Sequence, residues 1–388
     1  MRVRVAHRRA ALLFAFAALG IAAAVMPATA AGTAGAKTLV IAVEGPQSGS
    51  QAGNGQDQLR GVRLAVQELN AHGGLWNGRK VAIYAADDKG DAAKAKPVAR
   101  AVIARGIHFV IGPYNSSVGI ENLPLYRRHH TLPLWMTSRD ETAGLGATVQ
   151  PMNTQIAPIE ARYAKQLGVH RVAMLVDDTT NGAFTKGMAD RLRTALQHEG
   201  ASVSWTSVKE TTDPGTGGSY YADQVTAALG SSPDLVYVST YFPEGLEIAK
   251  ALAAKGNAPS CLMGLANVDT GFLAKATLVQ AQRCVFSGVP AATEMPSAGS
   301  YVRHYRAAFG NDPGVWGAFT YDSARILFAA IDKARSFRVA AVERRLRATK
   351  SYRGATGAIT IVPKTGYRKI VPVSILRVNG RKRFVIAK

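Results

Sequence analysis

The feature that most constrains this chain is a regular alternation of short apolar runs with longer amphipathic segments. In the first part, the runs that read as buried strands lie at residues 39–43, 81–85, 109–111 and 132–136. Helical patterns separate them, and the first carries apolar residues at positions 59, 62, 66 and 69. Strands that alternate with helices form a parallel sheet covered on both faces. The alternation therefore predicts an α/β fold.

The same alternation starts again after Pro151. Further strands are expected at residues 171–176, 203–208, 235–240, 262–263 and 285–286, with helices at 183–199 and 244–255. Gly-rich loops are expected at residues 45–55 and 213–219. A chain of 388 residues is long enough for two domains, so the pattern predicts two lobes, each with its own sheet.

The last part of the chain adds elements that must pack on lobes already built. Helices are expected at residues 300–310, 316–334 and 340–349, before a β-rich tail at 358–386 with a hairpin turn at Asn379-Gly380. The chain should therefore cross several times between the lobes. We expect lobe 1 to comprise residues 37–152 and 291–355, and lobe 2 to comprise residues 153–290 and 356–388.

The N-terminus has the pattern of a secretory signal peptide. Four arginines within the first nine residues precede an apolar run at 10–26, and Ala28-Thr29-Ala30 supplies a small-residue cleavage site. Removal of residues 1–30 would leave a short disordered mature N-terminus at 31–36. No cysteine lies near the cleavage site, and no later run reaches the roughly 18 apolar residues needed to span a bilayer. We therefore expect a periplasmic protein without a lipid anchor.

Charge and motif content argue against several classes of function. The net charge of +21 is spread along the chain, without a nucleic-acid-binding motif or an aromatic-interleaved basic patch, so we expect no nucleic-acid partner. The sequence contains neither the phosphate-binding motif G-x-x-x-x-G-K-[ST] nor the nucleophile motif G-x-S-x-G. Gly53-Asn54-Gly55 lacks a third glycine at the spacing of a dinucleotide site. We expect neither enzymatic activity nor a cofactor.

Pairs of polar residues have simpler explanations than catalysis or metal binding. His129-His130 are neighbours that would point about 100° apart on a helix, a poor geometry for a shared metal. Asp87-Asp88 and Asp177-Asp178 each follow a strand and precede a helix, where helix capping explains them. No metal site is expected.

The only cysteines, Cys261 and Cys284, each stand at the start of a short apolar run. Neighbouring strands would allow them to face each other, and an oxidising compartment favours a disulfide. The alternative is two reduced, buried cysteines.

Residues 108–119, with the sequence HFVIGPYNSSVG, are the strongest candidate for a binding site. A buried strand ends at Gly112-Pro113, and Asn115, Ser116 and Ser117 follow as ready N-caps of a helix. The unpaired N–H groups of a helix start, its dipole and two hydroxyls form an anion site. We interpret it as the site for a carboxylate or another acceptor-rich group. The alternative is that the serines only cap the helix.

Other polar residues also follow predicted strands, at the sheet edge where open α/β folds bind ligands. These residues are Ser138, Arg139, Asp140, Asn181, Tyr241 and Asn267. They provide hydroxyls, a carboxylate, a guanidinium and an aromatic ring, but no activated nucleophile. This composition suits the recognition of a small solute.

Several stretches together make the mature chain resemble the periplasmic solute-binding proteins of branched-chain amino-acid ABC transporters. They are QSG (47–49), RGVRLAVQELNAHGG (60–74), DD (87–88), GIHFVIGPYNSS (106–117), DLVYVSTYFPEG (234–245) and AFTYDSA (318–324). The resemblance implies the type I periplasmic binding protein fold, with two Rossmann-like lobes, parallel central sheets and three hinge crossings. It also implies that the lobes close on a solute and deliver it to an inner-membrane permease. We expect a monomer.

The resemblance also implies roles for single residues. Ser116, with the backbone around Asn115 and Ser117, matches the serine region that binds the ligand's carboxylate. Ser138 and Asp140 match positions that receive the α-ammonium, through a backbone carbonyl and a side chain. Tyr241 matches an aromatic residue of the second lobe that helps to close the site.

The sequence departs from the family pattern at the ammonium end of the site. Asn54 and Asn181 stand where amino-acid binders often have tyrosines. The acid that pairs with the ammonium should fall near Ala266 or Asn267, and neither residue is acidic. Because an unpaired buried ammonium is costly, the missing carboxylate indicates a replacement or a different ligand.

Three explanations for this departure remain open. Asp140 is a candidate replacement, unless Ser138 and Glu141 only form a capping box. Arg139 is a candidate for binding a second acidic group of the ligand. The ligand could instead lack an ammonium, as a short amide or an aromatic or aliphatic acid does. Tyr114 could then supply an apolar wall, while Trp135 is expected in the core. A ligand sensor and an exported α/β hydrolase are the alternatives to a transport receptor.

Overall fold

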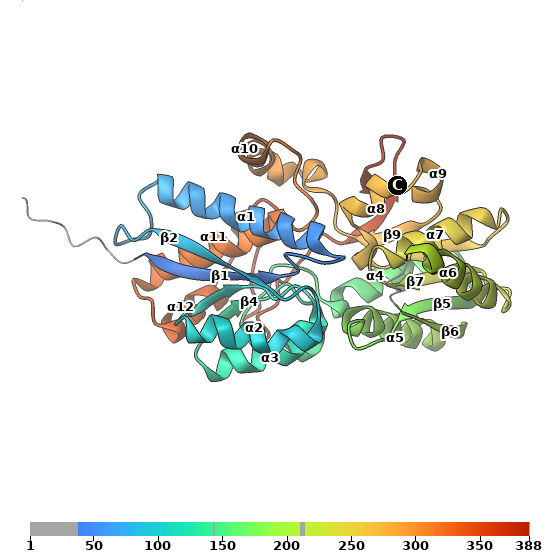
Figure 1. Cartoon of the computed structure of the whole chain (residues 1–388), viewed down its shortest axis with the longest axis horizontal. Helices are drawn as coiled ribbons and strands as arrows, with labels where there is room; N and C mark the ends of the chain where they lie inside the picture. The colour runs from blue at the N-terminus through green and yellow to red at the C-terminus, as the bar shows by residue number, and fades with distance from the viewer. Residues whose placement is uncertain (1–37, 143, 210–213, 388) are drawn as a thin grey trace, which may run out of the picture. The chain divides into compact units, whose positions relative to one another are not determined.

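The computed structural model describes residues 38–142, 144–209 and 214–387, and the expected signal peptide falls outside them. Figure 1 labels the elements along the chain. Every helix among the described residues is too short or too polar to cross a membrane.

The first sheet contains four parallel strands in the order β2-β1-β3-β4. The strand bounds are β1 Leu39–Gly45, β2 Val81–Asp87, β3 Phe109–Ile111 and β4 Leu132–Leu134. Figure 1 shows α1 (Ala52–Ala71) and α11 (Gly317–Ala334) on one face, and α2 (Ala92–Ala104) and α3 (Ser116–Arg128) on the other. The strands expected in this part of the chain are confirmed.

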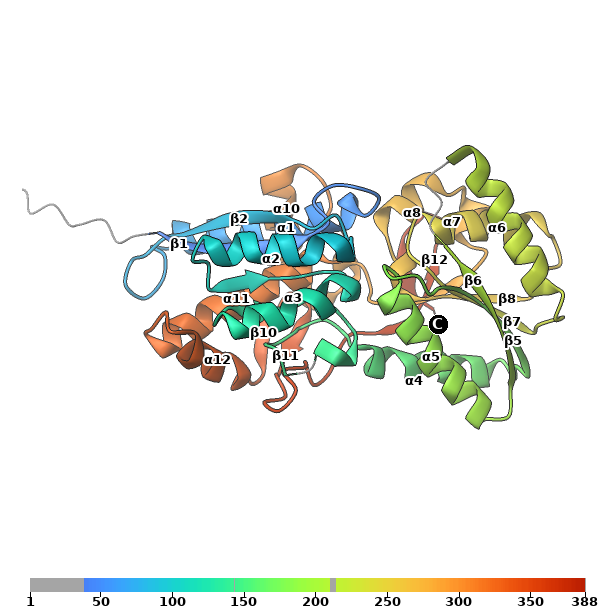
Figure 2. The same ribbon diagram turned by 60° about the horizontal axis from the view of Figure 1, so that its bottom comes forward.

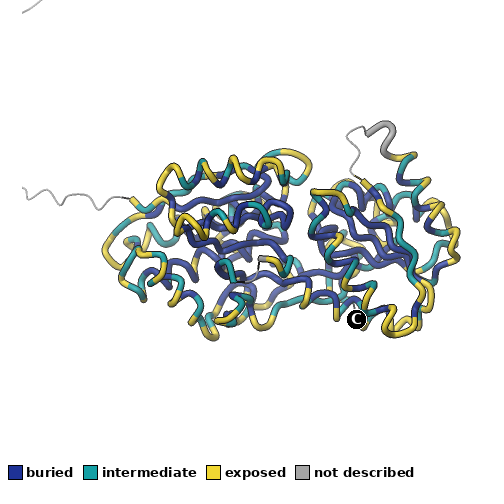
Figure 3. Tube along the Cα trace, turned by 90° about the horizontal axis from the view of Figure 1, so that it is seen from below, coloured by how far each residue is buried: buried dark blue, intermediate teal, exposed yellow. Residues whose placement is uncertain are grey.

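The side chains of β1 explain why its sequence is continuously apolar. Ile41 and Val43 belong to a core shared with α1 and α11, whereas Ala42 belongs to a separate core shared with α2 and α3. All three residues are buried because helices cover both faces of the sheet at this point, whereas Val40 near the start of β1 is exposed. Figure 3 shows the strands of both sheets as buried and the outer surfaces of the helices as exposed.

The second sheet contains seven strands in the order β13-β12-β9-β8-β7-β5-β6. The strand bounds are β5 Arg171–Asp177, β6 Ser202–Val208, β7 Leu235–Ser239, β8 Ser260–Met263, β9 Val285–Gly288, β12 Ser374–Val378 and β13 Phe384–Ile386. β5 to β9 run parallel, whereas β12 and β13 add an antiparallel edge joined through the expected turn at Asn379-Gly380. The parallel sheet predicted here is therefore mixed at one edge.

Helices cover both faces of the second sheet as well. Figure 2 shows α4 (Asn153–Gln166) and α5 (Ala183–His198) on one side, with α6 (Pro214–Leu229) and α7 (Glu244–Ala254) on the other. The short helices α8 (Thr270–Lys275) and α9 (Leu278–Ala281) connect β8 to β9. Cys261 of β8 forms a disulfide with Cys284, which directly precedes β9.

Three helices differ from the sequence-based expectation. The pattern does not predict α4, whose sequence contains Pro158. α1 starts at Ala52, inside the loop expected at 45–55, and a Cβ atom at Gly55 would lie 2.0 Å from the carbonyl oxygen of Pro46. Gly55 therefore permits a close approach within a helix. α6 starts at Pro214, so most of the loop expected at 213–219 is helical.

The paired aspartates do not cap helices, contrary to the expectation. Asp87 accepts hydrogen bonds from the N–H groups of Gln47 and Ser48, at 2.9 and 3.2 Å, and so holds the loop after β1. The N-cap of α2 is instead Asp91, which accepts the N–H of Ala93 at 2.9 Å. The pair at 177–178 likewise bonds to groups outside the first turn of α5.

The late elements begin with α10 (Gly299–Phe309), α11 and α12 (Val339–Arg347), and continue with the hairpin of β10 (Tyr352–Gly354) and β11 (Gly357–Ile359). We propose the expected lobe division of 37–152 with 291–355 and of 153–290 with 356–388, but with its last boundary moved towards β12. Thr356 donates its N–H to Asp322 of α11 at 2.8 Å, and Arg368 donates to the carbonyl of Val149 at 3.3 Å. These bonds favour a last boundary that lies later, just before β12.

Candidate binding site

A pocket lies beyond the carboxyl ends of strands from both sheets, where α/β folds bind ligands. The first part of the chain and α11's N-cap contribute Tyr114, Ser116, Met136, Ser138, Gln150 and Trp316. The second part contributes Phe184, Tyr241, Leu265 and Ala266. The pocket contains about 280 Å³ of space between atoms, part of it at its open mouth.

The start of α3 forms the polar end of this pocket. The side chain of Asn115, the N-cap residue, makes no capping bond among the described residues. The first N–H groups of an α-helix have no partner within the helix, and the positive end of the helix dipole lies there. This end of the pocket therefore offers N–H donors to a ligand.

The two serines lie in the first turn of α3 and do not cap it, which contradicts the capping alternative. Ser116 Oγ accepts the N–H of Ser138 at 3.2 Å, so its own proton remains to be donated. Ser117 Oγ is buried and has no hydrogen-bond partner among the residues that the structure describes. Both hydroxyls add donor capacity to the helix start.

Tyr114 contributes a phenol to the pocket wall. Its hydroxyl accepts the side-chain amide of Asn54 at 3.4 Å, and its ring lies 6.0 Å from that of Trp316. Burial raises the pKa of Tyr114 well above its usual value, and the nearby Tyr241 and Asp269 raise it further. Tyr114 is therefore a neutral donor at physiological pH.

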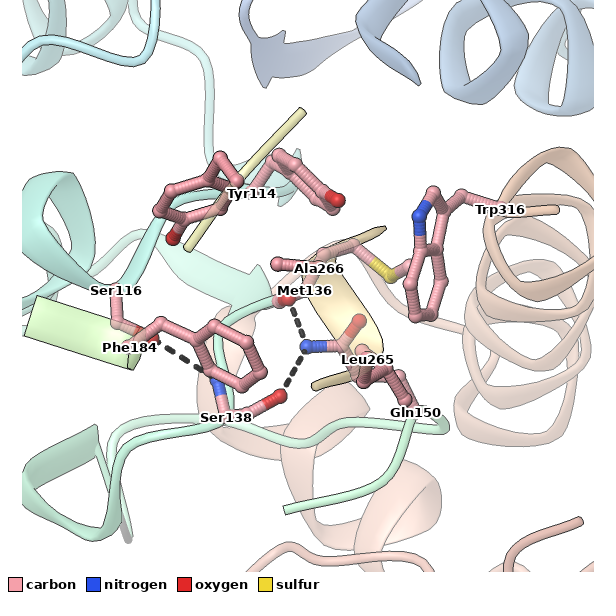
Figure 4. A pocket seen from close by; sticks show the side chains of 10 residues that line it. Tyr114, Ser116, Met136, Ser138, Gln150, Phe184, Leu265, Ala266 and Trp316 are labelled. Carbon is pink, nitrogen blue, oxygen red and sulfur yellow. Dashed lines mark hydrogen bonds between the residues drawn. The ribbon is translucent and has the colours of Figure 1, made fainter. Parts of the chain in front are cut away.

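Gln150 occupies the floor of the pocket. Figure 4 shows its amide nitrogen directed at the carbonyl of Met136 and at Ser138 Oγ, the latter at 3.0 Å. The carbonyl oxygen of Met136 can only accept a hydrogen bond, so the Gln150 side-chain atom that faces it is the amide nitrogen and not the amide oxygen. Its Oε1 is buried and has no partner in the described part of the chain. Ser138 Oγ in turn donates to the carbonyl of Pro151 at 2.7 Å.

Aromatic and aliphatic groups form the opposite wall. The rings of Phe184 and Tyr241 lie 6.2 Å apart, and Leu265 and Ala266 follow β8. Burial, with a smaller contribution from Asp177, raises the pKa of Tyr241. None of the ten lining residues, all within the described chain, carries a formal charge.

An acid lies close behind the pocket wall. Asp269 is 4% exposed, and as the N-cap of α8 it accepts the N–H of Gly271 at 2.5 Å. Burial raises the pKa of Asp269, while hydrogen bonds from Gly271 and Asn54 lower it. Asp269 is thus held by protein donors and does not line the pocket.

The structure brings four predicted site residues together on the pocket wall: Tyr114, Ser116, Ser138 and Tyr241. Three more lie directly behind it. Asn54 bonds to Tyr114, Asn115 donates to Gln51 at 2.9 Å, and Ser117 follows Ser116 in α3.

Arg139 and Asp140 lie outside this pocket, in a second hollow. Arg139 bonds to Glu141 and donates to the carbonyl of Ala183 at 2.8 Å, so the capping box of Ser138 with Glu141 is not formed. Asp140 forms an ion pair with Arg191 of α5. Both charged groups are therefore engaged within the protein.

The remaining predicted residues have structural contacts. Asn181 accepts the N–H of Ala92, at the start of α2, at 3.2 Å. Asn267 is fully buried and donates to the carbonyl of Thr240 at 2.8 Å. Trp135 is fully buried, as expected for a core residue. None of these residues lines the pocket.

Sequence reasoning missed the pocket residues that carry no motif. These are Met136, Gln150, Phe184, Leu265 and Trp316. Trp316 lies two residues before the AFTYDSA stretch and Phe184 closely follows Asn181, so proximity to these features is the signal that the sequence offers. Gln150 has no such signal.

Known proteins resemble the chain over most of its length. Among curated proteins, the Leu/Ile/Val-binding protein BraC3 of Rhizobium johnstonii is 28% identical over 332 residues, covering 83% of this chain and 87% of the relative. The Leu/Ile/Val-binding protein of Escherichia coli K12 is 28% identical over 250 residues, covering 62% of this chain and 65% of the relative.

Solved structures share the fold at lower sequence identity. The leucine-binding protein LivK of Thermotoga maritima gives a TM-score of 0.80 at 19% identity, covering 90% of this chain and 98% of that chain. A Rhodopseudomonas palustris solute-binding protein in complex with 3,4-dihydroxybenzoic acid gives 0.76 at 18% identity, covering 90% and 96%. The family model described as "Periplasmic binding protein" matches residues 38–382, so the chain belongs to the periplasmic binding protein family.

Proposed function

We propose that this protein is the extracytoplasmic receptor of an ABC importer and captures a small carboxylate-bearing solute. The observation that carries the proposal is the uncapped start of α3 with the Ser116 hydroxyl, opening into an uncharged pocket walled by residues of both sheets. Donors without a nucleophile or a charged catalytic group suit binding rather than turnover. Family membership and relatives described as Leu/Ile/Val-binding proteins support a receptor role.

Closure of the two lobes on the solute is the proposed mechanism. Contacts from α5 and from Asn181 in the loop before it reach the first part of the chain at Ala92, Arg139 and Asp140. These contacts exist only while the two parts are close, so they stabilise a closed form. A solute held by both walls would shift the population towards that form.

The partner and compartment follow from the same proposal. The receptor would hand its solute to an inner-membrane permease, act as a monomer in the periplasm and carry out no reaction. The expected signal peptide at 1–30 is consistent with export.

Thermal unfolding of the mature protein tests the proposal with a panel of amino acids, carboxylic acids and short amides. A solute present at 100 times its Kd stabilises the folded state by about 2.7 kcal/mol, which raises Tm. We expect at least one carboxylate to do so. The proposal is wrong if the amides stabilise the protein and no carboxylate does, or if no member of the panel does.

Ser116→Ala then tests the site, with calorimetry on the carboxylate found. The loss of one hydrogen bond to a charged group costs about 1.5–3 kcal/mol, or roughly 10- to 150-fold in Kd. Ser204→Ala is the matched control, because its exposed hydroxyl contacts only that of Ser231, at 3.3 Å, among the bonds of the described chain. Equal affinity in Ser116→Ala and the control would show that the carboxylate binds elsewhere.

A further inference from the structure

Building on the proposed receptor function, we propose that the solute is a small carboxylic acid without an ammonium group, because the acceptors that an ammonium would need already receive donors from the protein, two of them from Gln150. The chemical class is an aromatic or branched aliphatic acid with an uncharged body.

The acceptors at the pocket floor are used within the protein. A protonated amine has three N–H donors to satisfy. The carbonyl of Met136 and Ser138 Oγ both receive the Gln150 amide. The carbonyl of Ser138 receives the N–H of Asn153 at 2.8 Å. The two positions that the family resemblance assigns to ammonium binding, the Ser138 carbonyl and the Asp140 side chain, thus each already interact with a protein donor, since Asp140 pairs with Arg191.

The pocket wall also lacks a compensating negative charge in the described chain. Ala266 presents a methyl group, and the nearby Asp269 is engaged by Gly271 and Asn54. A cation moved from water into this pocket would lose its hydration without gaining a carboxylate partner, which is unfavourable.

The donors suit an anion even though no positive side chain lines the pocket. The Ser116 hydroxyl and the first N–H groups of α3 lie together at one end of the pocket. A helix start with such donors binds a carboxylate through dipoles alone. Gln150 lines the same pocket, is 2% exposed and has an Oε1 without a partner among the described residues, so it indicates a ligand there independently of the helix start.

The rest of the pocket sets the body of the acid. Phe184, Trp316 and Leu265 offer apolar surface. Gln150 Oε1 has no partner within the described chain, so it can accept a hydroxyl on the solute without requiring a charge. These apolar walls and the one free amide oxygen suit an uncharged ring or a short branched chain as the body of the acid.

Matched pairs of ligands test the inference by calorimetry on the mature protein. The pairs are 4-methylpentanoate with leucine and 3-phenylpropanoate with phenylalanine, and 4-hydroxybenzoate is added as a rigid hydroxy acid. We expect an acid of the panel to bind at least tenfold tighter than any amino acid, which corresponds to about 1.4 kcal/mol. An amino acid that binds as tightly as its acid would overturn the inference and leave the proposed function intact. If neither amino acids nor acids bind, both fail.

Gln150→Ala gives a second, independent readout. The substitution frees the carbonyl of Met136 and Ser138 Oγ, so the ratio of amino-acid to acid affinity should rise at least tenfold over the wild type. Gln282→Ala is the matched control, since this amide also donates to a backbone carbonyl, that of Val378 at 3.0 Å. Neither Gln282 nor Val378 lines the pocket. An unchanged ratio in a folded Gln150→Ala protein would overturn the role of Gln150. If that variant does not fold, the ligand pairs on the wild type still decide the inference.

Discussion

Glu160 should make the stability of this protein depend on pH. Its carboxylate is fully buried in α4 beneath the second sheet, where Tyr237 donates to it at 3.1 and 3.2 Å and Ser287 donates at 2.5 Å. Burial raises the pKa of Glu160 from 4.5 to about 7, against the lowering effect of these hydrogen bonds. The raised pKa means that folding favours the protonated carboxyl.

The magnitude follows from linkage between protonation and folding. Each pKa unit corresponds to about 1.4 kcal/mol, so a pKa of about 7 instead of 4.5 corresponds to about 3 kcal/mol. This contribution is fully present below pH 4.5 and is lost as the pH rises through 7. Glu160→Gln removes the titrating group while keeping a hydrogen-bonding side chain of the same size. Relative to the wild type, the variant should therefore gain about 3 kcal/mol of stability between pH 4.5 and pH 8.

Urea denaturation of both proteins at several pH values measures this difference. Other buried acids, including Asp88 with a pKa raised to about 7, also bend the wild-type curve, but they cancel in the comparison of variant with wild type. Glu247→Gln is the control, since this glutamate of α7 is partly exposed and pairs with Lys250. Parallel curves for Glu160→Gln and the wild type would refute the reasoning.

Two further substitutions test packing and closure. Asp57→Ala removes the carboxylate that accepts the N–H groups of Gly314, Trp316 and Gly317 at 2.6–2.9 Å. The free energy of unfolding, measured by urea titration, should therefore fall by about 3 kcal/mol, and by less in Asp57→Asn. An unchanged urea midpoint in both variants would contradict this. Asn181→Ala removes the bond to Ala92 and should weaken solute binding about two- to tenfold through faster dissociation, measured by stopped flow. Asn77→Ala, whose bond to Arg79 lies within one loop, should bind as the wild type does, and equal dissociation rates in the two variants would exclude a role in closure.

The strands were predictable because burial on both faces leaves a simple mark in the sequence. β1 and β5 are apolar at nearly every position, and a run of that kind has few alternatives. The starts of helices with polar or glycine-rich first residues have no comparable pattern in the sequence. α1 begins within a glycine-rich segment because Gly55 must pass close to Pro46, a contact that only the folded chain reveals.

The site was predictable where one stretch carries all of its parts. A strand, a turn and a helix start lie within residues 108–119, so local rules lead to Ser116. Asp140 shows the limit of such rules, because its ion pair with Arg191 joins segments that no local pattern relates. The expectation that Asp140 replaces a missing acid depended on its being free, and the second lobe supplies its partner.

Gln150 shows why the polarity of a site cannot be read from residue types alone. By residue type alone, Ser138, Met136 and Gln150 would offer a ligand several acceptors suited to an ammonium. The hydrogen bonds among them change this interpretation, because one neutral amide donates to two of the acceptors, and Gln150 Oε1 is the one of the three without a partner among the described residues. Meanwhile the donors around Ser116 remain uncommitted. A pocket with spare donors and few spare acceptors selects for an acceptor-rich solute, even where the fold is shared with proteins described as binding amino acids.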